Sequence, residues 1–158
     1  MCTYTYLLTS CLTCTHTFFY YRCIEEGISP LPEFVRCDAA KLPFKTNSLD
    51  ALHAGAAMHC WPRLSAVLEE IHRVLKPGGK FYASTFLAQN LQGIAATSQW
   101  SNTAGSNTGF YIFKDEAELE GLLVDAGFFN GTDASTGTVD VRREGRGCAI
   151  IKCVKRTA

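Results

Sequence analysis

The chain has 158 residues, of which 47% are hydrophobic and 19% are charged, and these values are typical of one soluble globular domain. Lys plus Arg and Asp plus Glu each number 15, so no net charge attracts nucleic acid or an anionic membrane surface. The eight cysteines do not form the framework of a small secreted disulfide protein, and reduced cysteines in an intracellular protein are expected. Cys11 and Cys14 have zinc-ligand spacing, but no second Cys/His pair at finger spacing follows, so no metal site is predicted.

Residues 1–24 differ in composition from everything that follows. They are rich in Thr, Tyr and Cys, and their only charged side chain is Arg22. They lack the features of a secretory signal, of a membrane span and of an Arg-rich transit peptide. Their β-branched and aromatic residues favour an extended strand. We interpret 1–24 as an atypical segment, as in a gene model with a misplaced start. Residues 25–158 are interpreted as the C-terminal portion of a larger domain to which 1–24 does not belong.

A βαβ unit is predicted in the middle of the chain. Residues 34–37 and 49–54 are short strand candidates, and residues 80–86 are a third. Between the last two, apolar residues recur three and four positions apart, as in a helix with one buried stripe: Leu64, Val67, Leu68, Ile71, Val74 and Leu75. The Pro-Gly-Gly at 77–79 ends that helix. A strand, a helix and a strand in this order imply parallel strands with a right-handed crossover.

The C-terminal half predicts a second helix and a hairpin. The helix begins at Asp115 with an acidic capping sequence and ends at Gly127. Residues 138–143 and 148–154 flank a glycine-containing turn and predict an antiparallel hairpin. The fold class predicted is therefore α/β, with parallel strands and an antiparallel C-terminal hairpin.

Three segments together carry a family resemblance: CDAAKLPF at 37–44, SLDALHAGAAMHCW at 48–61 and LEEIHRVLKPGGKFYASTF at 68–86. They resemble class I S-adenosylmethionine-dependent methyltransferases, especially the methyltransferase type 11 (UbiE/MenG-like) domain and plant plastid-type proteins with an HAGAA-HCWP segment. The match extends over residues 24–155. It implies an incomplete Rossmann-like sheet, S-adenosylmethionine as cofactor, and methyl transfer to a small-molecule acceptor.

The resemblance gives Asp38 and Ala39 roles in cofactor binding. It implies that Asp38 accepts a hydrogen bond from the adenine amine and that the backbone amide of Ala39 meets the adenine ring. An ionised carboxylate only accepts hydrogen bonds, which suits an exocyclic amine. The alternative is that Asp38 is a turn residue that caps Ala40 or Lys41.

The resemblance also implies that the backbone at Gly55 lies against the methionine part of the cofactor, because glycine permits close approach. The alternative is a tight strand-to-helix packing point. His59 is the catalytic candidate, as a base for an acceptor that must lose a proton, and packing beside Trp61 is the alternative. The polar segment 88–110, with Trp100, Phe110 and Tyr111 nearby, is either the recognition element for an apolar or aromatic acceptor or a surface loop.

The family's first strand, its G-x-G-x-G loop and the acid that holds the ribose are missing from the sequence. We therefore expect a truncated chain that binds S-adenosylmethionine weakly or not at all, and in which 1–24 acts as a surrogate strand. A non-catalytic remnant acting as an interaction module is the alternative, and a nucleotide-dependent oxidoreductase fits the motifs less well. No nucleic acid and no membrane span are expected, the oligomeric state stays open, and the resemblance alone suggests the chloroplast.

Overall fold

The computed structural model contains two compact units, Met1–Pro43 and Phe44–Ala158, each with its own sheet. The domain boundary expected after residue 24 rests on the family resemblance and not on the compactness of the structure, and it stays a prediction. The segment 88–110, with Trp100, lies outside the described residues, as do Cys11 and Cys14. The structure describes residues 5–9, 21–29, 31, 33–87, 111, 113–129, 139–145 and 147–156.

The first unit contains a two-stranded parallel sheet. Strand β1 (Thr5–Thr9) pairs with β2 (Glu33–Cys37), from Thr5 opposite Glu33 to Thr9 opposite Cys37. The extended strand predicted within the first 24 residues and the strand predicted at 34–37 are therefore both present. Residues 21–25, between the two strands in the chain, are helical, which was not predicted, and Gly27 follows them with φ of +66°.

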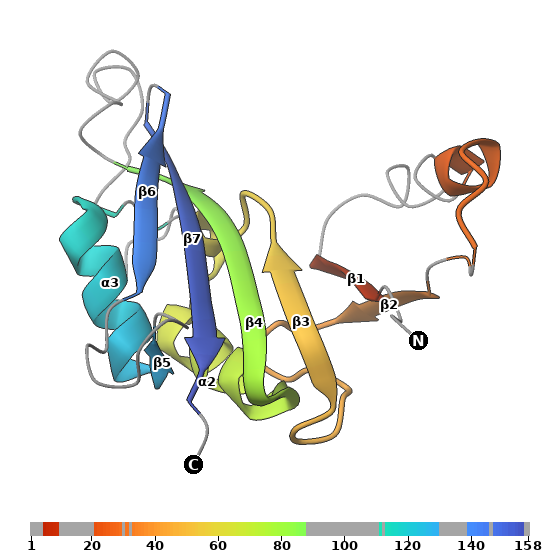
Figure 1. The fold of residues 1–158 in the computed structure, drawn as a ribbon, viewed down its shortest axis with the longest axis horizontal. Helices are drawn as coiled ribbons and strands as arrows, with labels where there is room; N and C mark the ends of the chain where they lie inside the picture. The colour runs from red at the N-terminus through yellow and green to blue at the C-terminus, as the bar shows by residue number, and fades with distance from the viewer. Residues whose placement is uncertain are drawn as a thin grey trace. The chain divides into compact units, whose positions relative to one another are not determined.

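The second unit is a five-stranded mixed sheet (Figure 1). Its order is β3 (Leu49–Ala54), β4 (Leu75–Phe86), β7 (Cys148–Lys155) and β5 (Phe128–Phe129), and β6 (Asp140–Glu144) also pairs with β7. β3 and β4 are parallel, whereas β7 is antiparallel to β4, β5 and β6. The predicted α/β class, with parallel strands and an antiparallel C-terminal hairpin, is confirmed.

Helix α2 (Leu64–Val74) is the crossover between the two parallel strands. Its apolar stripe is buried as the spacing predicts: Leu64, Val67, Leu68, Ile71 and Val74. β4 begins at Leu75, directly after the helix, rather than at Lys80 as predicted. The reason is a register irregularity: Leu49 pairs with Leu75 but Ala51 pairs with Lys80, so the extra residues of β4 bulge through the Pro-Gly-Gly.

Helix α3 (Glu116–Asp125) begins as its sequence predicts. The carboxylate of Asp115 accepts a hydrogen bond from the Glu118 N–H at 3.0 Å, and Gly127 ends the segment with φ of +91°. Leu119 and Leu123 are fully buried, and Leu122 and Ala126 are half-buried. The two-residue strand β5 that follows was not predicted, because two residues are too few to show a period.

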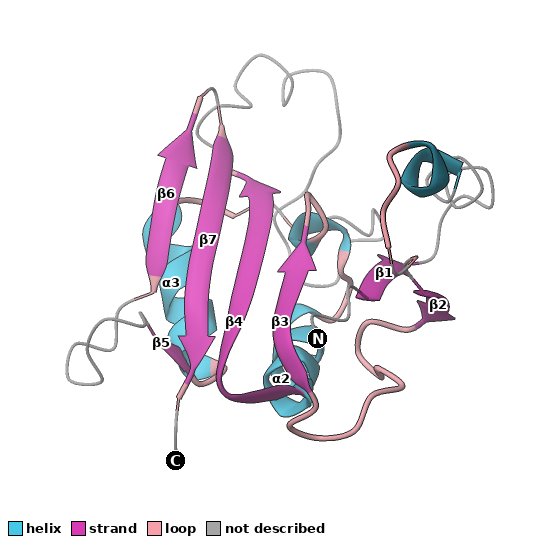
Figure 2. Ribbon diagram, turned by 45° about the vertical axis from the view of Figure 1, so that its right-hand side comes forward, coloured by secondary structure: helices cyan, strands magenta, loops and turns pink. Residues whose placement is uncertain are grey.

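The two helices cover one face of the five-stranded sheet (Figure 2). Alternate residues of β4 and β7 point into that core and are at most 9% exposed: Phe81, Ala83, Thr85, Ala149, Ile151, Cys153 and Lys155. The residues between them are half-buried or exposed, including Phe86 at 41% and Ile150 at 40%. The core therefore lies between the sheet and the helices. No helix in the described ranges is both long and apolar enough to cross a membrane.

Candidate functional site

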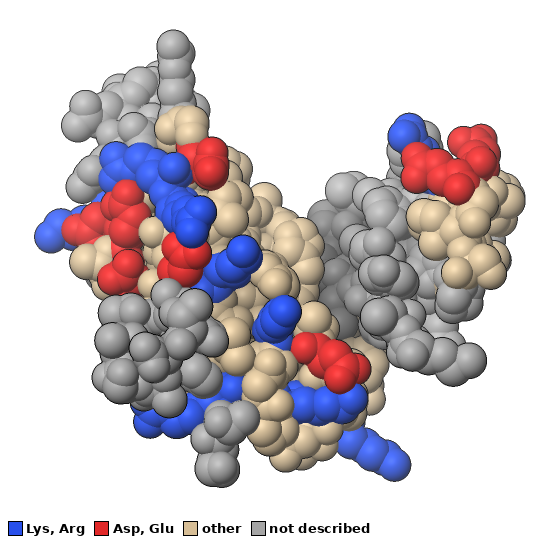
Figure 3. All heavy atoms as spheres, in the orientation of Figure 1, with Lys and Arg blue, Asp and Glu red and all other residues tan. Residues whose placement is uncertain are grey.

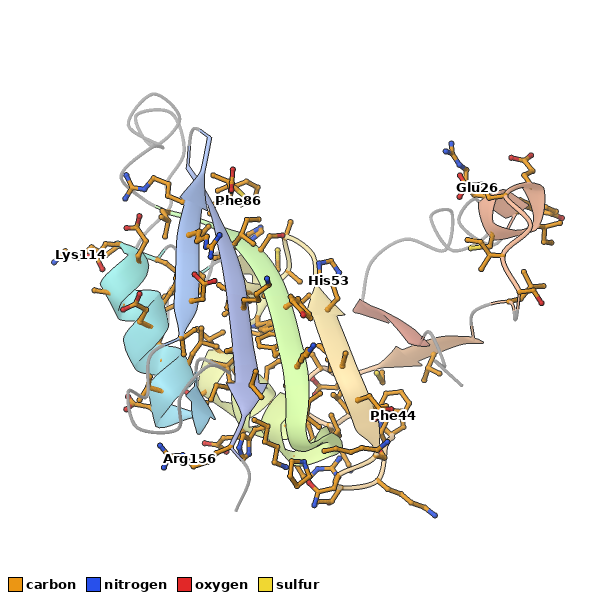
Figure 4. The ribbon with its side chains drawn as sticks, in the orientation of Figure 1. Glu26, Phe44, His53, Phe86, Lys114 and Arg156 are labelled. Carbon is orange, nitrogen blue, oxygen red and sulfur yellow. The ribbon has the colours of Figure 1, made fainter. Side chains whose placement is uncertain are left out.

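The carboxyl ends of β3 and β4 form one edge of the second unit, because parallel strands end on the same side. Ala54 pairs with Ala83 at this edge, and the chain continues from β3 into a turn and the 3₁₀ helix η1 (Met58–Cys60). His53 and Phe86 lie at this end of their strands (Figure 4). Open α/β sheets bind their ligands at this edge.

The turn after β3 is held by a hydrogen bond from the neighbouring strand. The backbone N–H of Ala56 donates to Oγ of Ser84 at 2.8 Å. Ala56 has φ of +47°, a left-handed conformation that costs an L-residue with a Cβ roughly 1–2 kcal/mol. A non-glycine residue in this conformation marks a turn whose shape is imposed by its surroundings, and such residues cluster at ligand sites.

Gly55 precedes this strained residue and is exposed. A Cβ at Gly55 would lie 3.1 Å from Cε1 of His53, tighter than an ordinary contact. That neighbour is the exposed side chain of His53, two residues earlier, and not a helix, so the contact does not decide between the packing alternative and cofactor binding. Because Gly55 is exposed, its backbone is open to close approach by a ligand.

His59 is half-buried on η1 and is held on several sides. Its Nδ1 lies 3.5 Å from Oγ1 of the buried Thr85, and its ring meets that of Phe86 edge-on with centroids 4.9 Å apart. Its carbonyl oxygen accepts a hydrogen bond from the Tyr111 N–H at 2.6 Å. Burial lowers the pKa of His59 below its ordinary value, so the imidazole is neutral at pH 7 and can accept a proton.

Tyr111 connects η1 to the start of α3. Its hydroxyl donates to a carboxylate oxygen of Glu118, and the other oxygen accepts from the Lys114 N–H at 2.6 Å. Burial, together with Glu118, raises the pKa of Tyr111 to about 12, so its hydroxyl stays protonated. Tyr111 therefore acts as a hydrogen-bond donor that positions the backbone of His59, and not as a base.

Asp38 lies in the other compact unit, at the end of β2. Its Oδ1 accepts a hydrogen bond from the Ala40 N–H at 2.9 Å, and its carbonyl accepts from the Lys41 N–H at 2.9 Å. The turn-capping alternative for Asp38 thus describes the structure. Asp38 is exposed and Ala39 is buried, so the turn presents a carboxylate outward from a packed backbone. The charge of Asp38 adds to burial in raising the pKa of the neighbouring Cys37 thiol.

The predicted site residues thus fall into two groups. Gly55 and His59 lie together at the end of β3, whereas Asp38 and Ala39 belong to the turn after β2 in the first unit. Sequence reasoning missed Ser84 and Thr85, for which two consecutive hydroxyl residues at the carboxyl end of a strand were the available signal. It named Tyr111 only as an aromatic residue near the acceptor segment, and its contacts with His59 and Glu118 were not predicted.

No cluster of three possible metal ligands occurs within the ranges that the structure describes. The cysteines described there are free thiols: Cys23, Cys37, Cys60, Cys148 and Cys153.

Comparison with known proteins identifies relatives of this arrangement. Residues 19–83 match the family model of a methyltransferase domain. An uncharacterized chloroplastic methyltransferase of Arabidopsis thaliana is 42% identical over 104 residues, which are 65% of this chain and 29% of that protein. The ubiquinone/menaquinone biosynthesis C-methyltransferase UbiE of Brucella canis is 35% identical over 106 residues, 66% of this chain and 39% of that protein. The chain therefore spans well under half the length of either relative.

Solved structures show the same fold at low sequence identity. A SAM-dependent methyltransferase of Methanosarcina mazei superposes with a TM-score of 0.62 at 20% identity, covering 99% of this chain and 84% of that one. The sequence matches, the fold and the predicted motifs all indicate a methyltransferase domain. Residues 19–83 of this chain therefore match a methyltransferase domain whose relatives include S-adenosylmethionine-dependent methyltransferases, and the cofactor that this match implies is S-adenosylmethionine.

Proposed function

We propose that the chain supplies part of the cofactor site of a methyltransferase that acts on a small molecule, with Asp38, Ala39 and Gly55 contacting S-adenosylmethionine. The observation that carries this proposal is the turn at Gly55 and Ala56. It is exposed, lies at the carboxyl end of two parallel strands, and keeps a strained φ of +47° through the bond to Ser84.

The residues present fit parts of this cofactor. The outward carboxylate of Asp38 is an acceptor for an amine, and the hydrogen bond from Ala40 fixes the direction of one of its oxygens. The exposed Gly55 has no Cβ to keep a ligand away from its backbone. When bound, the cofactor supplies an electrophilic methyl group on sulfur. The chain's own residues bind and orient it.

His59 is proposed as the base for acceptors that must lose a proton. It is neutral at pH 7 because burial lowers its pKa, and Thr85 holds Nδ1. If Nδ1 carries the proton and donates to Thr85, Nε2 has the lone pair that accepts one from the acceptor. A base contributes typically ~10²–10⁴-fold to such a reaction, whereas alignment of nucleophile and methyl is needed for any acceptor.

The acceptor proposed is a small molecule with an apolar or aromatic body. Phe86, which is 41% exposed, stands beside His59 at the same edge and offers a ring to pack against. The name of the Brucella relative indicates C-methylation in the biosynthesis of quinones, which are molecules of this kind. We also propose a chloroplast location on the strength of the Arabidopsis relative, and fractionation of plastids with an antibody to the endogenous protein tests it.

Binding measurements with matched variants test the proposed function. We expect S-adenosylmethionine to bind the chain in the millimolar range and Asp38→Asn to weaken binding about tenfold, since a hydrogen bond to a charged group is worth roughly 1.5–3 kcal/mol. Asn keeps an oxygen for the Ala40 N–H, so the turn survives. Asp50→Asn removes an equally negative, exposed side chain that pairs with Lys76, and it serves as control.

Equal loss of affinity in the Asp38 and Asp50 variants would contradict the proposed contacts. Absence of any binding in the millimolar range would contradict the proposal that this chain contacts the cofactor.

A further inference from the structure

A concave site lies at the end of the five-stranded sheet that is opposite Gly55 and His59. There β7 ends and β4 begins, opposite the edge that carries Ser84 and His59. Phe86 and Arg156 mark these two ends in Figure 4. The cavity has a volume of about 610 Å³, within the range of small-molecule sites. It is lined by residues from α2, β4, α3, β5, β7 and the loops between them: Asn47, His72, Pro77, Val124, Gly127, Phe128, Lys155 and Arg156.

The unusual member of this lining is Lys155, a cation that is only 9% exposed. Its Nζ donates to Oδ1 of Asn47 at 2.7 Å and to the carbonyl of Leu75 at 2.9 Å. Both acceptors are neutral, although the Leu75 carbonyl ends α2, where the helix dipole favours a positive charge. Burial lowers the pKa of Lys155, and no carboxylate opposes this. An ammonium has three donors, so one is left for a further acceptor.

The rest of the lining adds positive charge and apolar surface. Arg156 follows Lys155, and within the described part of the chain neither forms an ion pair with a carboxylate. Basic atoms gather at this lower end of the sheet in Figure 3. Pro77, Val124 and Phe128 supply apolar walls, and the ring of Phe128 is fixed edge-on against His72 at 5.4 Å.

We infer that this cavity binds a small molecule with one anionic head, a carboxylate or a phosphate, and a short apolar body. The head would pair with Lys155 and Arg156, supplying the counter-charge that a desolvated cation lacks, and the body would lie against Val124 and Phe128. Because the cavity lies at the opposite end of the sheet from Gly55 and none of its lining residues is assigned to the cofactor, the two ligands do not compete for the same residues.

The test uses four probes with the same chain length: hexanoate, hexyl phosphate, hexanol and hexylamine. We expect the two anions to shift the backbone NMR signals of Gly127 and Val124 and to bind about tenfold more tightly than hexanol, with hexylamine weakest. The ratio between hexanoate and hexyl phosphate identifies the preferred head. Added salt weakens the binding of the anions and not that of hexanol.

Variants assign the effect to the two cations. Lys155→Met should reduce anion affinity by about tenfold. Arg156→Gln lies at an exposed position and should reduce anion affinity severalfold. This variant tests the proposal even if the Lys155 variant fails to fold. Lys152→Met makes the same charge change at an exposed position of β7 outside the cavity and should leave affinity unchanged.

The inference is overturned if hexanol binds as well as hexanoate, if no probe shifts these signals at up to about 10 mM, or if Lys152→Met and Arg156→Gln weaken binding equally.

Discussion

The two compact units hold their candidate functional residues in different ways. In the second unit, Ser84 and Thr85 belong to β4, which pairs with a strand on each side. Phe81 and Ala83 of the same strand are buried against the helices. In the first, Asp38 is held by hydrogen bonds within a four-residue turn that follows a two-stranded sheet. Two-stranded sheets are marginally stable by themselves. We infer that packing positions Ser84 and Thr85, whereas local turn chemistry positions Asp38.

The largest expected difference is in hydrogen exchange. Amides of β4 and β7, at the centre of the five-stranded sheet, should exchange only in global unfolding, while those of β1 and β2 exchange through local opening. We expect protection factors at least ~100-fold higher in the first pair, because local opening costs several kcal/mol less. Equal protection in all four strands would break the comparison.

A core substitution should affect stability next most strongly. Phe81→Ala removes a fully buried ring that lies 5.5 Å from the ring of Phe128, and should reduce the free energy of unfolding by about 3–5 kcal/mol. Phe86→Ala removes the same side chain from an exposed position of the same strand and should cost less than ~1 kcal/mol. Urea unfolding of both variants measures the difference. Similar losses would show that the outer face of the sheet is packed as well.

The bond between Ser84 and Ala56 gives a smaller, more local effect. Ser84→Ala removes the acceptor of the Ala56 N–H and should lower stability by about 1 kcal/mol, while weakening S-adenosylmethionine binding. Ser65→Ala, at an exposed position of α2, should be neutral or slightly stabilising because alanine favours helix. If the Ser84 variant keeps full cofactor affinity, the turn does not need this bond to bind its ligand.

The pH dependence of stability should be the smallest effect. Burial lowers the pKa of His59, and burial together with the charge of Lys155 lowers that of His72. The unfolded chain therefore binds protons more readily, so stability is complete above the ordinary histidine pKa of ~6.5 and declines as pH falls below it. The double variant His59→Gln/His72→Gln should show a shallower decline between about pH 7.5 and about pH 5.5. An unchanged slope would assign the decline to other groups.

The sequence predicted those features that depend on local patterns. The stripe of α2 follows from helical spacing, the start of α3 from Asp115, and the hairpin from a turn in which Gly145 and Gly147 have positive φ. Contacts between distant segments were not predictable in this way. The bond from Ala56 to Ser84 joins residues 28 positions apart, and a left-handed alanine has no compositional signal. The pairing of Lys155 with Asn47 spans 108 positions.

The most direct test of the account is a set of intermolecular NOEs from S-adenosylmethionine to the chain. The account predicts contacts from the adenine protons to the methyl group of Ala39 and from the methionine methylene protons to the α-protons of Gly55, both in one complex. Contacts from adenine to Gly55, or from the ligand only to residues outside these two turns, would contradict it.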